Sequence, residues 1–332
     1  MNSKVSNKIT YLNFALAFLI LNLHSAYMEL FDSNNIVLMI NQAVKVICNM
    51  AVPTFFFLSA MLFYRSCEKK KYIDVIITKV KTLLIPYICW NVICFPLKEF
   101  KNYMEFSALS FDSPIELVWN ILSSSYDPVL WFIRVLFIYI LLYPVNLYIL
   151  KKKRVYPFII ILMVVINIII GPTIGYATCR YWLPVYMLGA YVGYWYKQEV
   201  FESSAIRPKY GRITIAIVIT SIMVLWATFD SYGLFIFRMI SPVLYWVIAD
   251  VYLILKRPNW ILKQSFFFYC SQMIFSVFAQ KIYIKLFGTG EISAIISNIG
   301  IPCILLVILM CVAYLFNKIL PKTYCFLTGG RA

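Results

Sequence analysis

Charged residues are scarce in this sequence, and that scarcity excludes a soluble fold. Only 13% of the 332 residues are charged, whereas soluble domains contain about 25%. Hydrophobic residues make up 62% of the chain, and the mean hydropathy is +0.81. The sequence therefore predicts an integral membrane protein. Because no soluble domain fits anywhere, we expect residues 1–332 to form a single membrane domain.

Acidic residues are fewer than basic residues. The chain has 14 Asp and Glu and 30 Lys and Arg, which gives a net charge of +16. Such an excess could indicate nucleic-acid binding. The basic residues, however, lie in short clusters between apolar runs, such as Lys151 to Arg154, where they orient membrane spans. We therefore expect no nucleic-acid partner, whereas anionic membrane lipids would be attracted to these clusters.

Signals for a metal or disulfide framework are also missing. The nine cysteines include no Cys-x-x-Cys pair, and most lie in apolar runs. Cysteines in such positions act as small packing residues. We expect neither a metal site nor a disulfide framework.

The chain instead has apolar stretches close to the ~20 residues that a helix needs to cross a bilayer. Lys and Arg fall consistently on one side when the N-terminus is placed in the cytoplasm. We therefore expect an all-α polytopic membrane protein with about ten transmembrane helices and with both termini cytoplasmic. The first stretch is longer than a signal-peptide core, so we interpret it as an uncleaved span. The ten stretches are residues 9–28, 36–64, 80–97, 129–150, 155–171, 181–196, 211–228, 233–255, 265–287 and 292–317.

The one histidine, His24, lies inside the first stretch. Histidine is the side chain best suited to moving a proton near neutral pH. An ionisable group within a membrane span is costly, so it usually has a function or a partner. Two interpretations follow: His24 transfers a proton, or it is hydrogen-bonded to a neighbouring helix for packing.

Other cations lie within or at the edge of the expected spans, namely Arg134, Arg180, Arg238 and Lys45. In the expected topology the three arginines lie in the outer half of the membrane with His24. Isolated cations in lipid are unfavourable, which favours a polar cavity shared between helices. The alternative for Lys45, Arg180 and Arg238 is that their long side chains reach the interface.

A histidine near fixed cations suits two kinds of site. In acyl transfer, the imidazole takes a proton from an attacking hydroxyl, and an arginine stabilises the oxyanion that develops on the acyl carbonyl. The same groups would bind an anionic sugar or a lipid phosphate without any reaction. Composition and spacing do not separate these alternatives.

Six segments in chain order carry recognisable motifs. They are residues 11–27 (YLNFALAFLILNLHSAY), 52–65 (VPTFFFLSAMLFYR), 79–90 (KVKTLLIPYICW), 130–144 (LWFIRVLFIYILLYP), 181–194 (YWLPVYMLGAYVGY) and 265–275 (SFFFYCSQMIF). Together they resemble the acyltransferase 3 family of bacterial membrane acyltransferases, which modify glycans, lipids and other exported acceptors. The most specific match is the Leu-Trp-Phe-x-Arg helix that begins at Leu130.

Three positions depart from the family pattern. The family commonly carries an arginine eleven residues before the first-helix histidine, and Asn13 stands there. Ser59 is followed by Ala60, where the family usually has glycine. Gln272 stands where many members have a second histidine, so an amide replaces a group that could carry out acid–base chemistry.

The resemblance implies a membrane acyltransferase. It would move a short acyl group, expected to be acetyl, from acyl-CoA to a hydroxyl of an exported or lipid-linked glycan. Acetyl-CoA or another acyl-CoA would be a co-substrate, and no cofactor would be tightly bound. The resemblance also implies the bacterial cytoplasmic membrane as the location and the polysaccharide synthesis machinery as a partner.

The same resemblance assigns roles to residues. His24 would be the general base, and Arg134 would stabilise developing charge or hold the donor thioester. Trp131 would stack on a sugar or pack in the core. Ser59 and Tyr269 would orient His24 or the acceptor, or hold helices together. The further candidates for substrate or donor binding are Asn13, Lys45, Arg180, Arg238 and Gln272.

Two other functions stay open at this point. The chain could be a translocator or exporter subunit for a polysaccharide or lipid-linked sugar, with a polar cavity that binds cargo. It could also be a catalytically inactive scaffold in a synthesis complex, an interpretation motivated by Asn13, Ala60 and Gln272.

Overall fold

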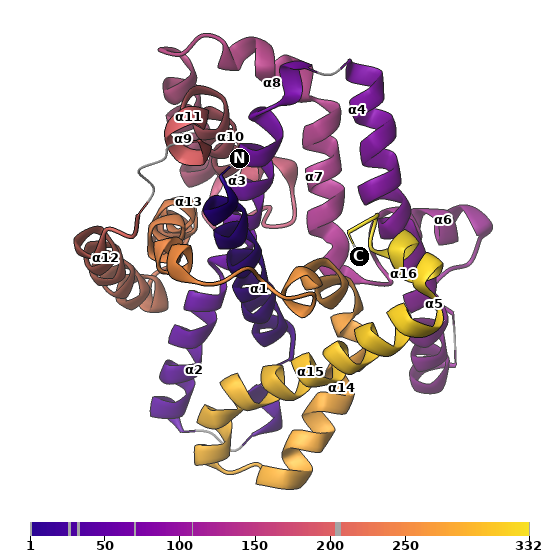
Figure 1. Cartoon of the computed structure of the whole chain (residues 1–332). Coiled ribbons are helices and arrows are strands. Elements are labelled where there is room, and N and C mark those ends of the chain that lie inside the picture. The colour runs from indigo at the N-terminus through magenta and orange to yellow at the C-terminus, as the bar shows by residue number, and fades with distance from the viewer. Residues whose placement is uncertain are drawn as a thin grey trace.

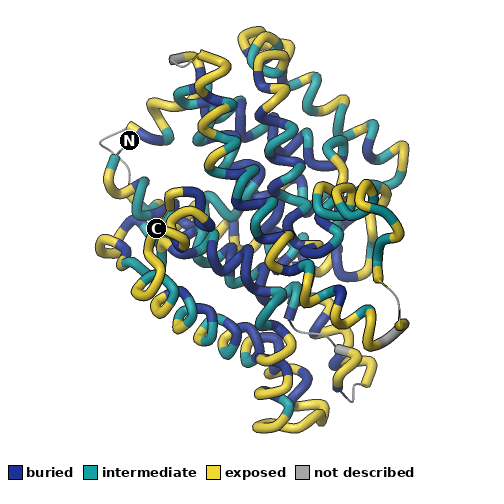
Figure 2. The backbone as a smooth tube through the Cα atoms, turned by 90° about the vertical axis from the view of Figure 1, so that its right-hand side faces the viewer, coloured by how far each residue is buried: buried dark blue, intermediate teal, exposed yellow. Residues whose placement is uncertain are grey.

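The structure is a computed structural model that describes residues 2–25, 28–31, 34–69, 71–107, 109–202 and 207–331. These residues form helices and connecting turns, with no strand among them. Figure 2 shows that buried positions follow the middle of the molecule, whereas exposed positions follow its outer helices and its ends.

The helices follow the apolar stretches of the sequence closely. In chain order the α-helices are α1 (Ser3–Ser25), α2 (Asn35–Cys48), α3 (Ala51–Tyr64), α4 (Tyr72–Lys79), α5 (Ile85–Phe106), α6 (Pro114–Leu122), α7 (Trp131–Leu141), α8 (Tyr143–Leu150), α9 (Tyr156–Ile170), α10 (Cys179–Trp195), α11 (Lys197–Phe201), α12 (Tyr210–Phe229), α13 (Ser231–Ile248), α14 (Ser265–Phe287), α15 (Glu291–Ile319) and α16 (Pro321–Leu327). The short 3₁₀ or π turns are η1 (Met28–Leu30), η2 (Cys67–Lys69), η3 (Val80–Leu84), η4 (Pro128–Leu130), η5 (Ala249–Ile254) and η6 (Ile261–Lys263).

The ten expected spans are only partly supported by the lengths of these helices. Helices lie in all ten stretches, although residues 26 and 27 of the first stretch lie outside the described residues. Among the described residues, five helices are long and apolar enough to cross a membrane, or six if the bent pair of α7 and α8 counts as one span. The five are Asn35–Tyr64, Tyr72–Met104, Tyr210–Phe229, Ser231–Ile254 and Glu291–Ile319.

The position of α1 explains how a largely apolar helix can also carry several polar side chains. α1 contacts α2, α3, α14, α15 and η5, and Figure 1 shows it in the centre of the fold. Polar side chains of α1 therefore meet protein: the buried Lys8 forms an ion pair of 2.6 Å with Asp250, and the buried Asn22 donates to the backbone carbonyl of Asn298. A helix surrounded by others does not need an apolar surface on every side.

The second expected span is broken close to Pro53, where the sequence favours a break. α2 ends at Cys48 and α3 begins at Ala51. Proline has no N–H to donate to the carbonyl four residues earlier, so Pro53 leaves the Asn49 carbonyl without its helical partner. The two halves still form a single span of 30 residues, Asn35–Tyr64.

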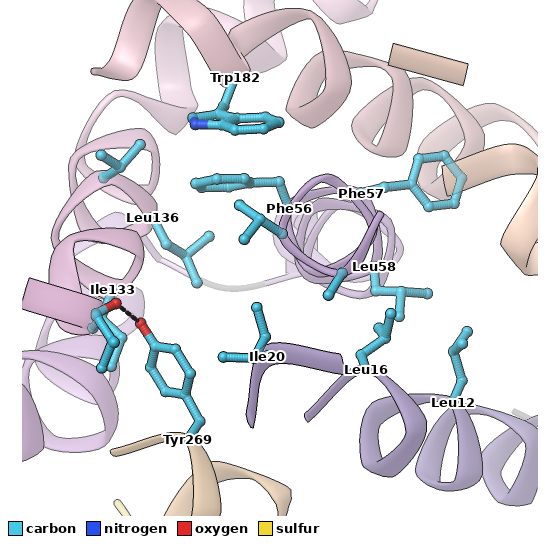
Figure 3. Close-up of a cluster of buried hydrophobic side chains, with 14 of the residues drawn as sticks. Leu12, Leu16, Ile20, Phe56, Phe57, Leu58, Ile133, Leu136, Trp182 and Tyr269 are labelled. Carbon is cyan, nitrogen blue, oxygen red and sulfur yellow. Dashed lines mark hydrogen bonds between the residues drawn. The ribbon is translucent and has the colours of Figure 1, made fainter. Parts of the chain in front are cut away.

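The contact between α3 and α10 is unusually close. An added Cβ at Gly189 would lie 2.2 Å from the backbone oxygen of Phe57, and one at Gly193 would lie 2.2 Å from that of Met61. Small residues four apart allow membrane helices to approach to this degree. Figure 3 shows Trp182 of α10 stacked over Phe56 of α3, and both side chains are fully buried in the core.

Candidate active site

A cavity of about 190 Å³ lies between α1, α3, α7 and the start of α14. Most of its lining is apolar, and Figure 3 shows Ile20 of α1 pointing toward the space between Leu58, Leu136 and Tyr269. The polar side chains in the lining are Asn13, His24, Ser59, Trp131, Ser265, Tyr269 and Arg331. Among the described residues that line the cavity there is no carboxylate, and Arg331 gives this lining a positive charge.

One face of α1 runs along the cavity. Asn13, Ile20 and His24 are spaced at seven and four residues, which places them on one side of a helix. Eleven residues separate Asn13 from His24, or about 16 Å along the axis. The cavity is therefore elongated, with Asn13 near one end and His24 near the other.

The direction of α14 shows which part of this helix lies beside each end of the cavity. The ring of Phe268 lies 6.3 Å from that of Phe14, and the Gln280 side chain donates to the backbone oxygen of Ser25 at 2.8 Å. α14 therefore runs parallel to α1. Its first turn lies beside Asn13, and its later turns pass His24.

Four polar side chains in the lining have no hydrogen-bond partner within the described part of the chain. Among the described residues, none bonds to the side chains of Asn13, His24, Ser59 or Trp131. All four are only partly exposed, and polar groups in such places are usually paired within a protein. Their donors and acceptors are therefore available to a ligand in the cavity.

Tyr269 differs from these four, because its hydroxyl is already engaged. The hydroxyl donates to the backbone oxygen of Val129 in η4, as Figure 3 shows by a dashed line. Tyr269 is 9% exposed and lines the cavity. The bond fastens α14 to the turn before α7 and forms part of the cavity wall.

Arg134 lies on the other side of α7. Phe132 and Leu136 line the cavity and are four residues apart, so they share one face of the helix. Arg134 is midway between them and points about 160° away. Its guanidinium donates to the backbone oxygen of Ser123 at 2.6 Å, at the end of α6.

The remaining predicted cations, Arg180, Arg238 and Lys45, are not in the lining of this cavity. The Arg238 guanidinium donates to the Tyr181 hydroxyl at 3.0 Å and to the Asn49 side chain at 2.7 Å. Arg180 donates to the backbone oxygen of Ile174 at 2.9 Å, and the backbone oxygen of Lys45 accepts from Asn49 at 2.7 Å.

The four groups expected to share one cavity are thus separated, since of them only His24 is in its lining. Each arginine instead donates to a protein oxygen, although one nitrogen of Arg180 and one of Arg238 are buried without a hydrogen-bond partner among the described residues. Arg238 has an indirect relation to the cavity: its guanidinium lies 4.6 Å from the centre of the Tyr176 ring, which is 5.4 Å from the ring of Trp131.

Gln272 is fully buried one turn after Tyr269 on α14. Its amide nitrogen donates to the backbone oxygen of Tyr269 at 2.9 Å, and its side-chain oxygen has no partner among the described residues. It is not part of the lining of the cavity.

Two of the polar lining residues named above, Ser265 and Arg331, were not among the predicted site residues. Ser265 begins α14 and is the first residue of a motif, so a sequence signal for it exists. Arg331 follows α16 and has no such signal, yet it supplies a cation at the Asn13 end of the cavity. Within the described part of the chain, no group of three or more His, Cys, Asp or Glu side chains could hold a metal ion.

Comparison with protein families adds an independent finding. A family described as an acyltransferase domain matches residues 7–318. Comparison with curated proteins and with solved structures found no match. The family match spans nearly the whole chain, including the four helices around the cavity. The chain is therefore an integral membrane protein of the acyltransferase 3 family, and this membership supports acyltransferase activity.

Proposed function

We propose that the chain moves an acetyl or another short acyl group from acyl-CoA to a hydroxyl of an exported or lipid-linked glycan. The observation that carries the proposal is the position of His24, the one histidine of the chain, in an elongated cavity beside polar side chains that have no hydrogen-bond partner among the described residues. Membership of an acyltransferase family makes acyl transfer the reaction that best fits this cavity.

His24 is the general base in this proposal. The imidazole accepts the proton of the acceptor hydroxyl while that oxygen attacks the thioester carbonyl. A C–O bond forms, the C–S bond breaks, and the proton returns to the departing sulfur, so the products are the acyl ester and free CoA. The apolar lining excludes water, which would otherwise hydrolyse the thioester.

The other unpaired side chains orient the two substrates. The Ser59 hydroxyl and the Asn13 amide offer donors and acceptors along the cavity, and the Trp131 ring offers a face on which a sugar can stack. Arg134 acts from behind α7, because its bond to Ser123 holds the end of α6 against this helix. Tyr269 keeps α14 and η4 together through Val129.

The expected topology supplies the donor from the correct side. With both termini in the cytoplasm of a bacterial cell and ten spans, the Asn13 end of the cavity faces the cytoplasm, where acyl-CoA is present. The basic inner loops then attract the phosphates of CoA, and the glycan approaches from the outer side, near His24. The synthesis machinery for that glycan would be the natural partner.

The test is acyl transfer by the purified full chain with acetyl-labelled acetyl-CoA and a membrane glycan fraction. We expect His24→Gln to reduce the rate about 10²–10⁴-fold, the usual contribution of a general base. Lys4→Gln is the matched control, since Lys4 is an exposed residue of the same helix, and it should keep full activity. A wild-type protein that binds glycan but transfers no label would instead indicate an exporter or a scaffold.

A further inference from the structure

Residues 321–331 return to the cavity from beyond the part of the chain that the family match covers. The match ends at residue 318, and the segment consists of α16 followed by the residues Thr328 to Arg331. In Figure 1 the C-terminal end lies between α7 and α16. Arg331 lines the cavity beside Ser265 and Phe266, so this segment adds a side chain to the site.

The segment is built into the fold. Tyr324 and Thr328 are at most 1% exposed. The Tyr324 hydroxyl donates to the side chain of Gln264 at 2.8 Å, and the Trp90 indole donates to the backbone oxygen of Leu327 at 3.2 Å. These contacts join the segment to α5 and to the residue that precedes α14.

Gly329 allows the final approach. Its φ is +62°, and an added Cβ would lie 2.4 Å from the backbone oxygen of Thr82. Only glycine adopts such a backbone at low cost and also fits against another backbone at this distance. The glycine thereby directs Arg331 toward η3 and the cavity.

Arg331 is held by one of its nitrogens, and the rest of the guanidinium stays available. One terminal nitrogen donates to the backbone oxygens of Thr82 at 2.9 Å and of Thr328 at 3.0 Å. The guanidinium carbon lies 4.1 Å from the centre of the Phe266 ring. Among the described residues no carboxylate pairs with it. An arginine positioned in this way can present its other N–H groups to a phosphate as a fork.

The start of α14 adds a second positive feature at the same end. Ser265 and Phe266 form the first turn of this helix of 23 residues, and no side chain caps it. The free N–H groups and the dipole of a helix favour an anion at its N-terminus. The guanidinium and the helix start therefore face the same part of the cavity.

We propose that Arg331 and the N-terminus of α14 bind a phosphate of the acyl donor. The inference rests on the proposed function and names how its donor is held. The phosphate site lies at the Asn13 end of the cavity, about 16 Å along α1 from His24. A donor with phosphates at one end, a thioester at the other and a long arm between them matches this arrangement.

The experiment compares two acetyl donors that differ in phosphate. Acetyl-CoA carries phosphates, whereas S-acetylpantetheine has the same arm and thioester without them. For Arg331→Gln we expect the KM for acetyl-CoA to rise about 10- to 100-fold, the range for hydrogen bonds to a charged group. The KM for S-acetylpantetheine and both kcat values should stay within twofold. An unchanged KM for acetyl-CoA, or an equal change for both donors, would overturn the proposal.

A second variant tests whether the change in KM comes from the position of the Arg331 guanidinium and not from a general disturbance of the fold. Gly329→Ala moves Arg331 away from Thr82 without altering the guanidinium, and it should raise the KM for acetyl-CoA in the same selective way. Gly290→Ala is the control, because nothing lies within 4 Å of an added Cβ there. A selective loss in Arg331→Gln but not in Gly329→Ala would show that the docked segment does not place the cation.

Direct binding separates the inference from the proposed function. CoA itself is the probe, and its Kd for the full-length wild type and for Arg331→Gln is measured by calorimetry. A Kd at least tenfold higher in the variant supports the phosphate site even if neither protein transfers an acetyl group. Equal affinities, or no binding of CoA by the wild type, would refute it.

Discussion

At the scale of single residues, hydrogen-bond partners divide the predicted site into two groups. Asn13, His24, Ser59 and Trp131 line the cavity, and their side chains have no hydrogen-bond partner among the described residues. Tyr269 is bound to a backbone oxygen within the wall. The motifs predicted all five as candidates, but a motif gives residue identity and spacing, not the partner that a side chain finds in the fold. The division favours ligand-binding roles for the first four residues and a positioning role for Tyr269.

Arg134 provides the sharpest prediction at this scale. A direct role on the acyl carbonyl requires the guanidinium to lie in the cavity, whereas its bond to Ser123 lies behind α7. Since a single N–H donor to a carbonyl can be supplied by an ammonium, we expect Arg134→Lys to keep kcat within about tenfold of the wild type. Arg134→Ala should lower the thermal unfolding temperature, because the end of α6 loses its partner. The two measurements are kcat for acetyl transfer and unfolding in detergent.

The outcome discriminates between positioning and catalysis. A loss of 100-fold or more in kcat for Arg134→Lys, with normal unfolding, would return the arginine to the oxyanion role that the resemblance implies. Ser123 offers only its backbone oxygen to this contact, so Ser123→Ala is the matched control. It removes the hydroxyl bonds to Asn120 and Ser125 but keeps the contact with Arg134, and it should keep the wild-type kcat.

At the scale of helices, the close contact of α3 and α10 determines the shape of the cavity. Phe57 and Met61 of α3 meet the two glycines of α10, while Phe55 and Ser59 line the cavity. Phe57 is midway between Phe55 and Ser59, so the two contacts use opposite sides of α3. Any shift of α3 away from α10 would therefore change the volume available to the substrates.

We predict that Gly189→Ala destabilises the protein and reduces its activity together. The added Cβ meets a backbone atom at 2.2 Å, which cannot rotate away as a side chain can. Overpacking of this kind costs about 1–3 kcal/mol. Thermal unfolding in detergent and acetyl transfer are the measurements. In α12, Gly211→Ala has nothing within 4 Å of its Cβ, so it should be neutral, and equal behaviour of the two variants would contradict this account of the contact.

Much of the helix pattern can be predicted from sequence, and the exceptions have physical causes. Long apolar runs place the helices, and Pro53 lies in the first turn of α3, just after the break between α2 and α3. Nothing in a hydropathy pattern predicts that α7 and α8 bend by 61°. Length alone does not identify a span: α1 and α14 each have 23 residues, yet they are not among the five helices long and apolar enough to cross a membrane, because their polar residues lower the mean hydropathy.

At the scale of the whole molecule, the least predictable part of the site is the one built from distant segments. Asn13 and Arg331 line the same cavity although almost the entire chain separates them. Local sequence patterns determine the helices. The return of residues 321–331 depends instead on two contacts between distant parts of the chain: Tyr324 bonds to Gln264, and Leu327 bonds to Trp90 of α5. Such contacts exist only after the helices have packed. The sequence shows that Arg331 belongs to a basic C-terminal segment, but it does not show that this arginine reaches the cavity.

The orientation of the molecule in the membrane gives the last prediction, and the bent pair of α7 and α8 decides it. If the pair crosses the membrane, residue 112 lies outside and residue 152 lies in the cytoplasm. If the pair turns back, both lie on one side.

Asp112 and Lys152 are both exposed, so a cysteine at either position can react with a maleimide. The exposed Cys303, Cys311 and Cys325 are first replaced by alanine to lower the background. We expect a membrane-impermeant maleimide to label Asp112→Cys in intact cells and to label Lys152→Cys only after the cells are permeabilised. Labelling of both in intact cells would mean that the pair is re-entrant. The number of spans after α6 would then change by one, and the cytoplasmic position of both termini could not hold.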